Sequence, residues 1–394
     1  MSICFDESRG TVHLTNGSIS YVMQLLDGRY LLHRYFGPAL RRWRGTGVPQ
    51  PAKRSYTTEY GDTHLYFDAL PWEFPVAGRG DYRRPAFAVT GDTGAPVSEL
   101  VFRSWRILDE KPESAALPVT FAAAGESETL AVDCFDEVTG VTLTLYYTIF
   151  ADADVIARQQ RIVNTGPIPV RITNLQSVSL SLPAASYDLL TLYGCHAREA
   201  QQSRAPIHQG VQAVGSRYGS SSPRHQPFWA VLDPAATETA GAVYGCMLAY
   251  SGNFNAVVEQ DAFGAVRAQM GLGDETFAWT LAPGEAFETP EALLTYSGQG
   301  LNGMSHNFHT VLRRHLLPPR WQGGPTFPAQ FLGRHVLRRQ SRKDRDPGTP
   351  RQRAGHGTVC AGRRLVPQRK RQPLLHGGLD LQHRQAARWH RSCC

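Results

Sequence analysis

Between residues 97 and 182 apolar and polar residues alternate along four successive segments, which are Leu130–Asp136, Val141–Phe150, Val155–Val163 and Val170–Leu182. Turn residues separate these segments, at positions 139–140, 152–154 and 165–167. Because successive side chains of a strand point to opposite faces, this alternation predicts strands that bury one face. Several such strands in a row, with no helical segment between them, predict antiparallel sheets packed as a sandwich.

Strand-like patterns of apolar residues also occur on both sides of residues 97–182. Near the N-terminus, Asp27-Gly28 separates two apolar runs and predicts a tight hairpin. Residues 37–95 and 183–227 have little periodicity, and we expect long irregular segments there. Strands are expected again over Phe228–Leu232, Gly241–Tyr250, Phe254–Glu259, Val266–Met270, Phe277–Leu281 and Ala292–Tyr296.

One helix is expected over residues 300–316, because Met304, Phe308, Val311, Leu312 and Leu316 recur at helical spacing before two prolines. A glycine pattern at positions 298, 300 and 303 opens this helix and matches a dinucleotide-binding fingerprint. No second strand and no acidic residue about 20 positions on follow it, so we interpret the glycines as a turn entering a connector helix.

Histidines could in principle form a metal site on this helix, since His306 and His309 lie three residues apart and His315 follows. A metal needs further converging ligands, and the sequence offers none. We therefore expect all three histidines on the helix surface, and we expect neither a metal nor a cofactor.

Residues 326–394 differ in composition from the rest of the chain. They hold 16 of the 41 Lys and Arg residues but only 3 of the 34 Asp and Glu residues, and they contain no Glu, Ile, Met or Tyr. Such a segment buries too little apolar area to offset its ordering entropy, so we expect a disordered basic tail. The sequence thus divides into a β domain over 1–300, a connector helix and linker over 301–325, and this tail.

The charge of the tail raises the alternative of a nucleic-acid-binding arm. We do not favour it, because aromatic residues are absent except for Phe327, Phe331 and Trp389 and the composition changes at a single point. The seven cysteines lack CxxC spacing, which favours a reducing, cytoplasmic compartment. The N-terminus lacks the features of a signal peptide, and no run of about 18 apolar residues predicts a membrane span.

Two loops combine histidine, other polar residues and aromatic neighbours. His196 lies in Tyr193–Glu199, and His225 lies in Ser220–Phe228. Sugar recognition combines hydrogen bonds to hydroxyl groups with apolar packing, so these loops are candidates for sugar contact. Turn formation alone is the competing interpretation for both loops.

Several longer stretches, in this order along the chain, resemble the N-terminal β-supersandwich domain of bacterial raffinose-type α-galactosidases, glycoside hydrolase family 36. They are Ser20–Leu25, Trp72–Pro75, Gly80–Ala86, Tyr187–Leu192, Val211–Arg217, Tyr250–Phe254, Pro283–Glu291 and Tyr296–Ser305. The resemblance covers residues 10–316. It implies that the connector helix leads into a (β/α)8 barrel, whose two aspartates hydrolyse terminal non-reducing α-D-galactosyl residues of raffinose or melibiose with retention.

The resemblance also implies contact between subunits, since in this family the sandwich reaches into a neighbouring active site. The loop position there is usually Trp, and His196 occupies it here, which makes His196 our candidate substrate-binding residue. Arg198 and Glu199 are interpreted as loop structure. A further family contact, made by an acidic residue, falls near Ala52 and Lys53, and neither of these residues is acidic.

The barrel motifs expected of this family are absent from the printed frame. Codons can be chosen for Ala329–Asp346 that, read one base later, give PNSWEGTYFDVSREKIE, and codons for Val359–Pro367 read in the same way give FVLDDGWF. Both resemble the family's first two barrel strands, so our hypothesis is a frameshift between Arg320 and Ala329. The chain is then a truncated, inactive product without catalytic residues, which self-associates. The alternative is a non-catalytic β-sandwich for carbohydrate binding or subunit assembly.

Overall fold

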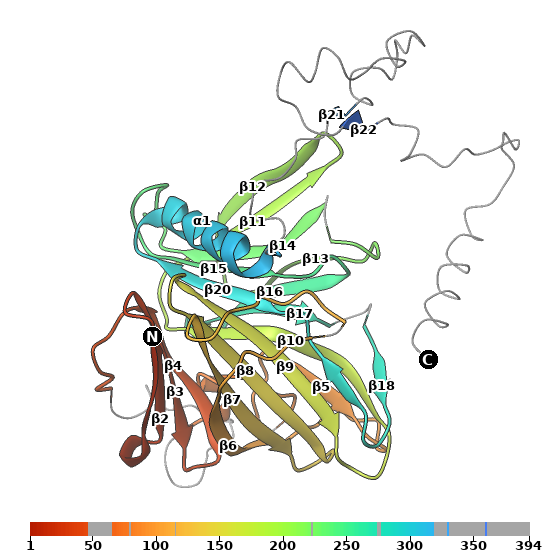
Figure 1. Ribbon diagram of the computed structural model, residues 1–394. Coiled ribbons are helices and arrows are strands. Elements are labelled where there is room, and N and C mark those ends of the chain that lie inside the picture. The colour runs from red at the N-terminus through yellow and green to blue at the C-terminus, as the bar shows by residue number, and fades with distance from the viewer. Residues whose placement is uncertain are drawn as a thin grey trace, which may run out of the picture. The chain divides into compact units, whose positions relative to one another are not determined.

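The computed structural model describes residues 1–45, 65–78, 80–114, 116–221, 224–273 and 277–318, with the backbone of 329–330 and 359–360. Residues Met1–Pro318 form one compact unit and Pro319–Cys394 a second. In the first unit nearly all regular structure is antiparallel β-sheet (Figure 1). The expected mainly β, sandwich-type fold is therefore confirmed.

The N-terminal sheet has four strands in the order β1-β2-β3-β4. They are β1 (Ser2–Asp6), β2 (Thr11–Thr15), β3 (Ile19–Leu26) and β4 (Tyr30–Pro38). Leu26 pairs with Tyr30, and the Arg29 amide donates to the Leu26 carbonyl oxygen at 2.9 Å. The two residues enclosed by this hydrogen bond, Asp27 and Gly28, have φ values of 52° and 64°. Two positive φ angles are what a type I′ turn requires, and the predicted hairpin is confirmed.

A ten-stranded sheet runs in the order β12-β11-β14-β15-β20-β9-β8-β7-β6, with β19 pairing to β9. Its strands are β6 (Leu100–Leu108), β7 (Ser127–Asp136), β8 (Val141–Phe150), β9 (Val155–Asn164), β11 (Asp188–Cys195), β12 (Arg198–Pro206), β14 (His225–Leu232), β15 (Val243–Leu248), β19 (Ala286–Glu288) and β20 (Ala292–Ser297). Three of the four alternating segments of the sequence form its neighbouring strands β7, β8 and β9, and the fourth forms β10 of the next sheet.

A six-stranded sheet has the order β13-β16-β17-β10-β18, and β5 also pairs with β10. Its strands are β5 (Phe87–Thr90), β10 (Val170–Leu182), β13 (Gly210–Ser216), β16 (Phe254–Gln260), β17 (Val266–Leu272) and β18 (Trp279–Leu281). Buried side chains from all three sheets form one continuous hydrophobic core. The segment 183–227, expected to be irregular, thus contains β11, β12 and β13.

The expected connector helix is present as α1 (Gly300–Val311), followed by a π-helical turn over Leu312–Leu316. Met304, Phe308 and Val311 bury its apolar face in a second core cluster against the ten-stranded sheet. Gly300 has a φ of 67°, and a Cβ there would collide with the carbonyl oxygen of Thr237. The glycine therefore serves a tight turn.

Short 3-10 helices lie at Glu7–Arg9 and Phe67–Ala69. Within the part of the chain that the structure describes, no helix is long and apolar enough to cross a membrane. In the second unit, β21 (Ala329–Gln330) pairs in parallel with β22 (Val359–Cys360). The prediction of disorder concerns residues that otherwise lie outside the described ranges.

Candidate functional site

The candidate residue His196 lies in the turn between β11 and β12, at the end of the ten-stranded sheet. Its side chain is exposed, and the following residue, Ala197, has a φ of 63°. The Glu199 carboxylate accepts a hydrogen bond from the Ala197 amide at 2.9 Å. A Cβ on Gly194 would collide with the Arg198 carbonyl oxygen, so the turn is tightly closed. The geometry presents His196 outward from a fixed turn.

The second candidate histidine, His225, was predicted in a loop, and that prediction is wrong because His225 is the first residue of β14. It pairs with Tyr193 of β11, and the Gly194 amide donates to the Arg224 carbonyl oxygen at 2.9 Å. The start of β14 therefore lies beside the end of β11, close in the fold to the turn that carries His196. His196 itself lies three residues beyond Tyr193, at the tip.

The helix histidines divide into two kinds. His306 and His309 are exposed, as expected, whereas His315 is 1% exposed, so its predicted surface position is wrong. The π turn places it against the sheet, where Nδ1 faces the Phe121 carbonyl oxygen at 2.9 Å and Nε2 faces Asp152 at 2.8 Å. These two contacts attach the C-terminal end of the connector helix to Phe121 and Asp152. Among the described residues, no group of three or more His, Cys, Asp or Glu side chains could hold a metal.

The contact between Asp152 and His315 should weaken at acidic pH, because it depends on the ionised carboxylate of Asp152. Burial alone would raise the pKa of Asp152, but hydrogen bonds from Arg314 and His315 hold it below the ordinary value of 3.8. Because the pKa in the folded state is depressed, the stabilisation is present above about pH 4 and is lost as the pH falls through the folded-state value.

Asp152→Asn should therefore lower the free energy of unfolding by about 1 kcal/mol at pH 7, since it removes the carboxylate from a buried histidine. The loss should vanish below the folded-state pKa of Asp152. Arg314→Gln is the control: Arg314 is 60% exposed, and its ion pair with the same carboxylate should be worth less than about 0.5 kcal/mol. Urea unfolding across pH measures both. An equal loss in the two variants would show that His315 does not fasten the helix.

Glu73, in the family-like stretch Trp72–Pro75, lies 0% exposed in the core. Its carboxylate pairs with Arg158 at 2.9 Å and accepts hydrogen bonds from the hydroxyls of Tyr21 and Tyr147 at 2.7 and 2.8 Å. His33 Nδ1 lies 3.2 Å away. Burial would raise the pKa of Glu73, but Arg158 and His33 hold it below its usual value. A carboxylate enclosed in this way stabilises the fold and is not exposed to a substrate.

A second enclosed carboxylate, Asp81, comes from the family-like stretch Gly80–Ala86. It forms ion pairs with Arg83 at 2.8 Å and with Arg267 of β17 at 2.6 Å. These pairs join the loop to the six-stranded sheet. Two of the stretches that carry the resemblance therefore have structural roles.

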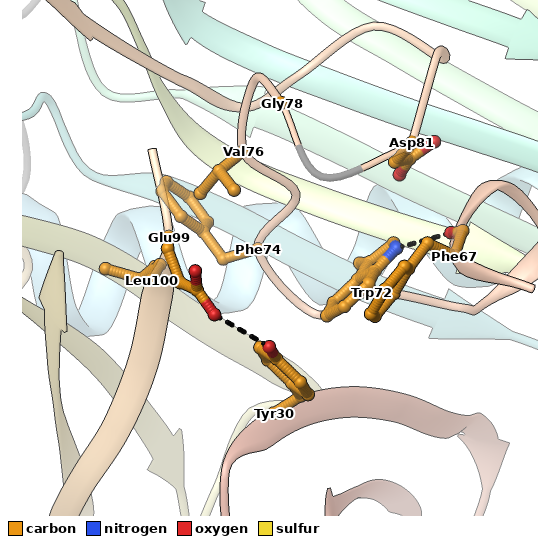
Figure 2. Close-up of a pocket in the computed structure, with 9 residues that line it drawn as sticks. All are labelled: Tyr30, Phe67, Trp72, Phe74, Val76, Gly78, Asp81, Glu99 and Leu100. Carbon is orange, nitrogen blue, oxygen red and sulfur yellow. Dashed lines mark hydrogen bonds between the residues drawn. The ribbon is translucent and has the colours of Figure 1, made fainter. Parts of the chain in front are cut away.

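Asp81 and Glu99 also line a small cavity, shown in Figure 2. Tyr30 donates to Glu99 at 2.9 Å, and the ring of Phe67 stacks on Trp72. The cavity measures only about 30 Å³, which is room for a water molecule and not for a sugar ring. Glu99 is also bound by Arg29 at 2.8 Å. The two carboxylates are therefore not placed to act as an acid and a base on a substrate.

Comparison with known proteins decides the family. The model for the glycosyl hydrolase family 36 N-terminal domain matches residues 29–282. The chain belongs to glycoside hydrolase family 36. It is 39% identical over 319 residues to α-galactosidase AgaA of Geobacillus stearothermophilus, covering 80% of this chain and 44% of that protein. It is 35% identical to α-galactosidase Mel36A of Lactobacillus acidophilus, covering 81% of this chain and 44% of that one.

Solved structures of family 36 α-galactosidases have a fold similar to that of this chain. The crystal structure of α-galactosidase AgaB of Geobacillus stearothermophilus has a TM-score of 0.85 at 34% identity, covering 91% of this chain and 50% of that one. AgaA gives a TM-score of 0.78 at 38% identity over 82% of this chain and 45% of its own length. The chain thus spans about half the length of the family 36 proteins that it matches. The described residues contain no (β/α)8 barrel.

Proposed function

We propose that this chain is the N-terminal β domain of an α-galactosidase acting on terminal non-reducing α-D-galactosyl residues of oligosaccharides such as raffinose and melibiose. The supporting observation is the similarity to α-galactosidases along the whole unit Met1–Pro318. AgaA variants have been crystallised with stachyose and with raffinose. Retention, through two barrel carboxylates about 5 Å apart, is part of the proposal.

The chain as printed is, in this proposal, inactive. The family-like sequence ends near residue 320, and residues 326–394 belong to a reading frame other than that of the barrel.

We further propose that His196 contacts sugar in a neighbouring subunit. The hairpin that carries it is exposed, and all nine residues of β12 are exposed at the end of the sheet. An open strand edge is a ready surface for pairing with another chain, which supports self-association. The described cysteines are free thiols, which supports a cytoplasmic location.

The test is an assay of the purified 394-residue chain with a chromogenic α-galactoside. We expect no turnover above that of a preparation from cells with the empty vector. Clear turnover that copurifies with the chain would contradict the proposed inactivity. Sequencing the gene across codons 320–329 provides the independent check.

A further inference from the structure

The described residues between β6 and β7 form neither helix nor strand, yet they are fastened to the segment between β19 and β20. Lys111 Nζ lies 2.6 Å from Glu291 Oε1, and the Thr120 amide donates to Glu291 Oε2 at 2.6 Å. Between these two points, Ser114 Oγ donates to the Glu288 carboxylate at 2.9 Å. One carboxylate, that of Glu291, therefore holds both ends of residues 111–120, which we call the strap.

The carboxylate of Glu291 is buried on a fixed part of the fold. The side chains of Lys111 and Glu291 are 4% and 1% exposed. The Glu291 carbonyl oxygen accepts a hydrogen bond from the Ala249 amide at 2.8 Å, and the Thr289 amide donates to the Gln160 carbonyl oxygen of β9 at 3.0 Å. Removing Lys111 would leave the carboxylate buried and unpaired, and opening of the strap would then be the way to bring water to it.

The strap ends at the connector. Phe121 is the residue directly after the strap, and its amide donates to the His315 carbonyl oxygen at 2.7 Å, while its own carbonyl oxygen lies 2.9 Å from His315 Nδ1. The bond to Glu291 and the two bonds to His315 therefore come from neighbouring residues. Pro112 and Pro118 lie within the strap and have fixed φ angles, which limits the conformations that the strap can take when one end moves.

We propose that the strap and the last turn of the connector, Leu312–Leu316, open and close as one clamp. In this clamp Glu291 holds a helix end to which it has no direct hydrogen bond or ion pair in the described structure. Local openings of folded proteins occur in contiguous cooperative units, and the two bonds between Phe121 and His315 make the strap and the turn contiguous. The clamp fixes the place at which the chain leaves the first unit, which ends at Pro318. Because the clamp lies entirely in this unit, it is independent of the proposed α-galactosidase activity.

Hydrogen exchange of the full chain, followed by mass spectrometry with residue-level fragmentation, tests the clamp. In Lys111→Met the amides of Phe121 and of the turn Leu312–Leu316 should exchange at least about tenfold faster, because only opening brings water to the unpaired Glu291 carboxylate. The double variant Lys111→Met/Glu291→Gln should regain most of the protection, since it removes the unpaired charge and keeps an acceptor at position 291.

Two controls separate opening of the clamp from other effects. Arg161→Gln is the matched variant, because it breaks an exposed ion pair with Glu288 on the same segment, and it should change the exchange rates by less than about twofold. The Leu25 amide donates to the Gly10 carbonyl oxygen at 2.7 Å in the N-terminal sheet, so it reports on the whole unit and should keep its rate in all variants.

The coupling must also act in the opposite direction, because coupling between two sites is reciprocal. Asp152→Asn loosens His315, which the strap holds from its other side, and the Thr120 amide should then exchange about fivefold faster. Arg314→Gln should leave the Thr120 amide unchanged. Asp152→Asn removes only a partly exposed carboxylate, so it decides the question even if Lys111→Met does not fold.

Unchanged exchange of the turn 312–316 in Lys111→Met, or unchanged exchange of the Thr120 amide in Asp152→Asn, would overturn the proposal, because the strap and the connector would then open separately. An equal increase at the Leu25 amide would overturn it as well, since it would mean that the whole unit has become less stable.

Discussion

Replacing Arg158 by methionine should lower the free energy of unfolding by about 3–5 kcal/mol, the usual cost of removing one partner of a buried ion pair. Arg158 and Glu73 are both 0% exposed, so no water can replace the lost partner. Arg158 also donates to the hydroxyls of Tyr21 and Tyr147 at 3.0 and 3.1 Å and to the Ser179 carbonyl at 3.2 Å. These bonds join β3, β8, β9 and β10, which belong to all three large sheets.

The substitution should also reverse the pH dependence of this site. In the parent chain the pKa of Glu73 is depressed, so its contribution is present above the ordinary value of 4.5 and is lost as the pH falls through the folded-state value. Without Arg158, burial should raise that pKa. The variant should then gain stability relative to the parent as the pH is lowered from 7 towards 5.

Urea unfolding followed by tryptophan fluorescence measures these effects. Arg158→Lys keeps the charge and should cost less than Arg158→Met. The double variant Glu73→Gln/Arg158→Met should recover about 1–3 kcal/mol of the loss, because it removes the unpaired charge. The control is Arg103→Met, which breaks an exposed pair with Glu137 and should cost less than about 1 kcal/mol. If the double variant is no more stable than Arg158→Met, the unpaired Glu73 carboxylate is not the cause of the loss of stability.

Strand prediction from the sequence worked where one face of a strand is buried. The bounds of β8 and β10 agree with the alternating segments, since their inward side chains lie in the core. In β12 the nine residues are all exposed, so no alternation marks it. The strands β11 and β13, in which only Leu190, Thr191 and Ser216 are buried, were missed as well within 183–227. A pattern that arises from burial cannot identify a strand that buries nothing.

Prediction of the candidate site from the sequence was limited as well, because the site depends on contacts between residues that are distant in the chain. The sequence predicted His196 and His225 as loop residues, which is wrong for His225, the first residue of β14. The pairing of His225 with Tyr193 places it near the turn of His196, and a pairing between distant strands cannot be predicted from local sequence. The buried position of His315 depends on a π turn, which helical periodicity does not predict.

If the proposed frameshift is correct, deleting one base between codons 320 and 329, in the gene with its downstream DNA, should yield an active α-galactosidase from a gene whose present product we expect to be inactive. The deletion makes the ribosome read one base later, in the frame that gives both barrel-like motifs. Enzymes typically accelerate their reactions by about a millionfold or more, so the difference from the printed chain should exceed the sensitivity of a chromogenic assay by orders of magnitude. Both proteins should be purified through the same tag before comparison.

Deleting two bases at the same position is the matched control, because it produces the third frame with almost the same DNA. That product should be as inactive as the printed chain. Both products keep residues 1–320 and therefore the core around Arg158, so a loss of the β domain cannot explain the difference. Activity only after the one-base deletion would assign the chemistry to the barrel that follows α1. If the one-base product is soluble, of family length and still inactive, the frameshift hypothesis is wrong.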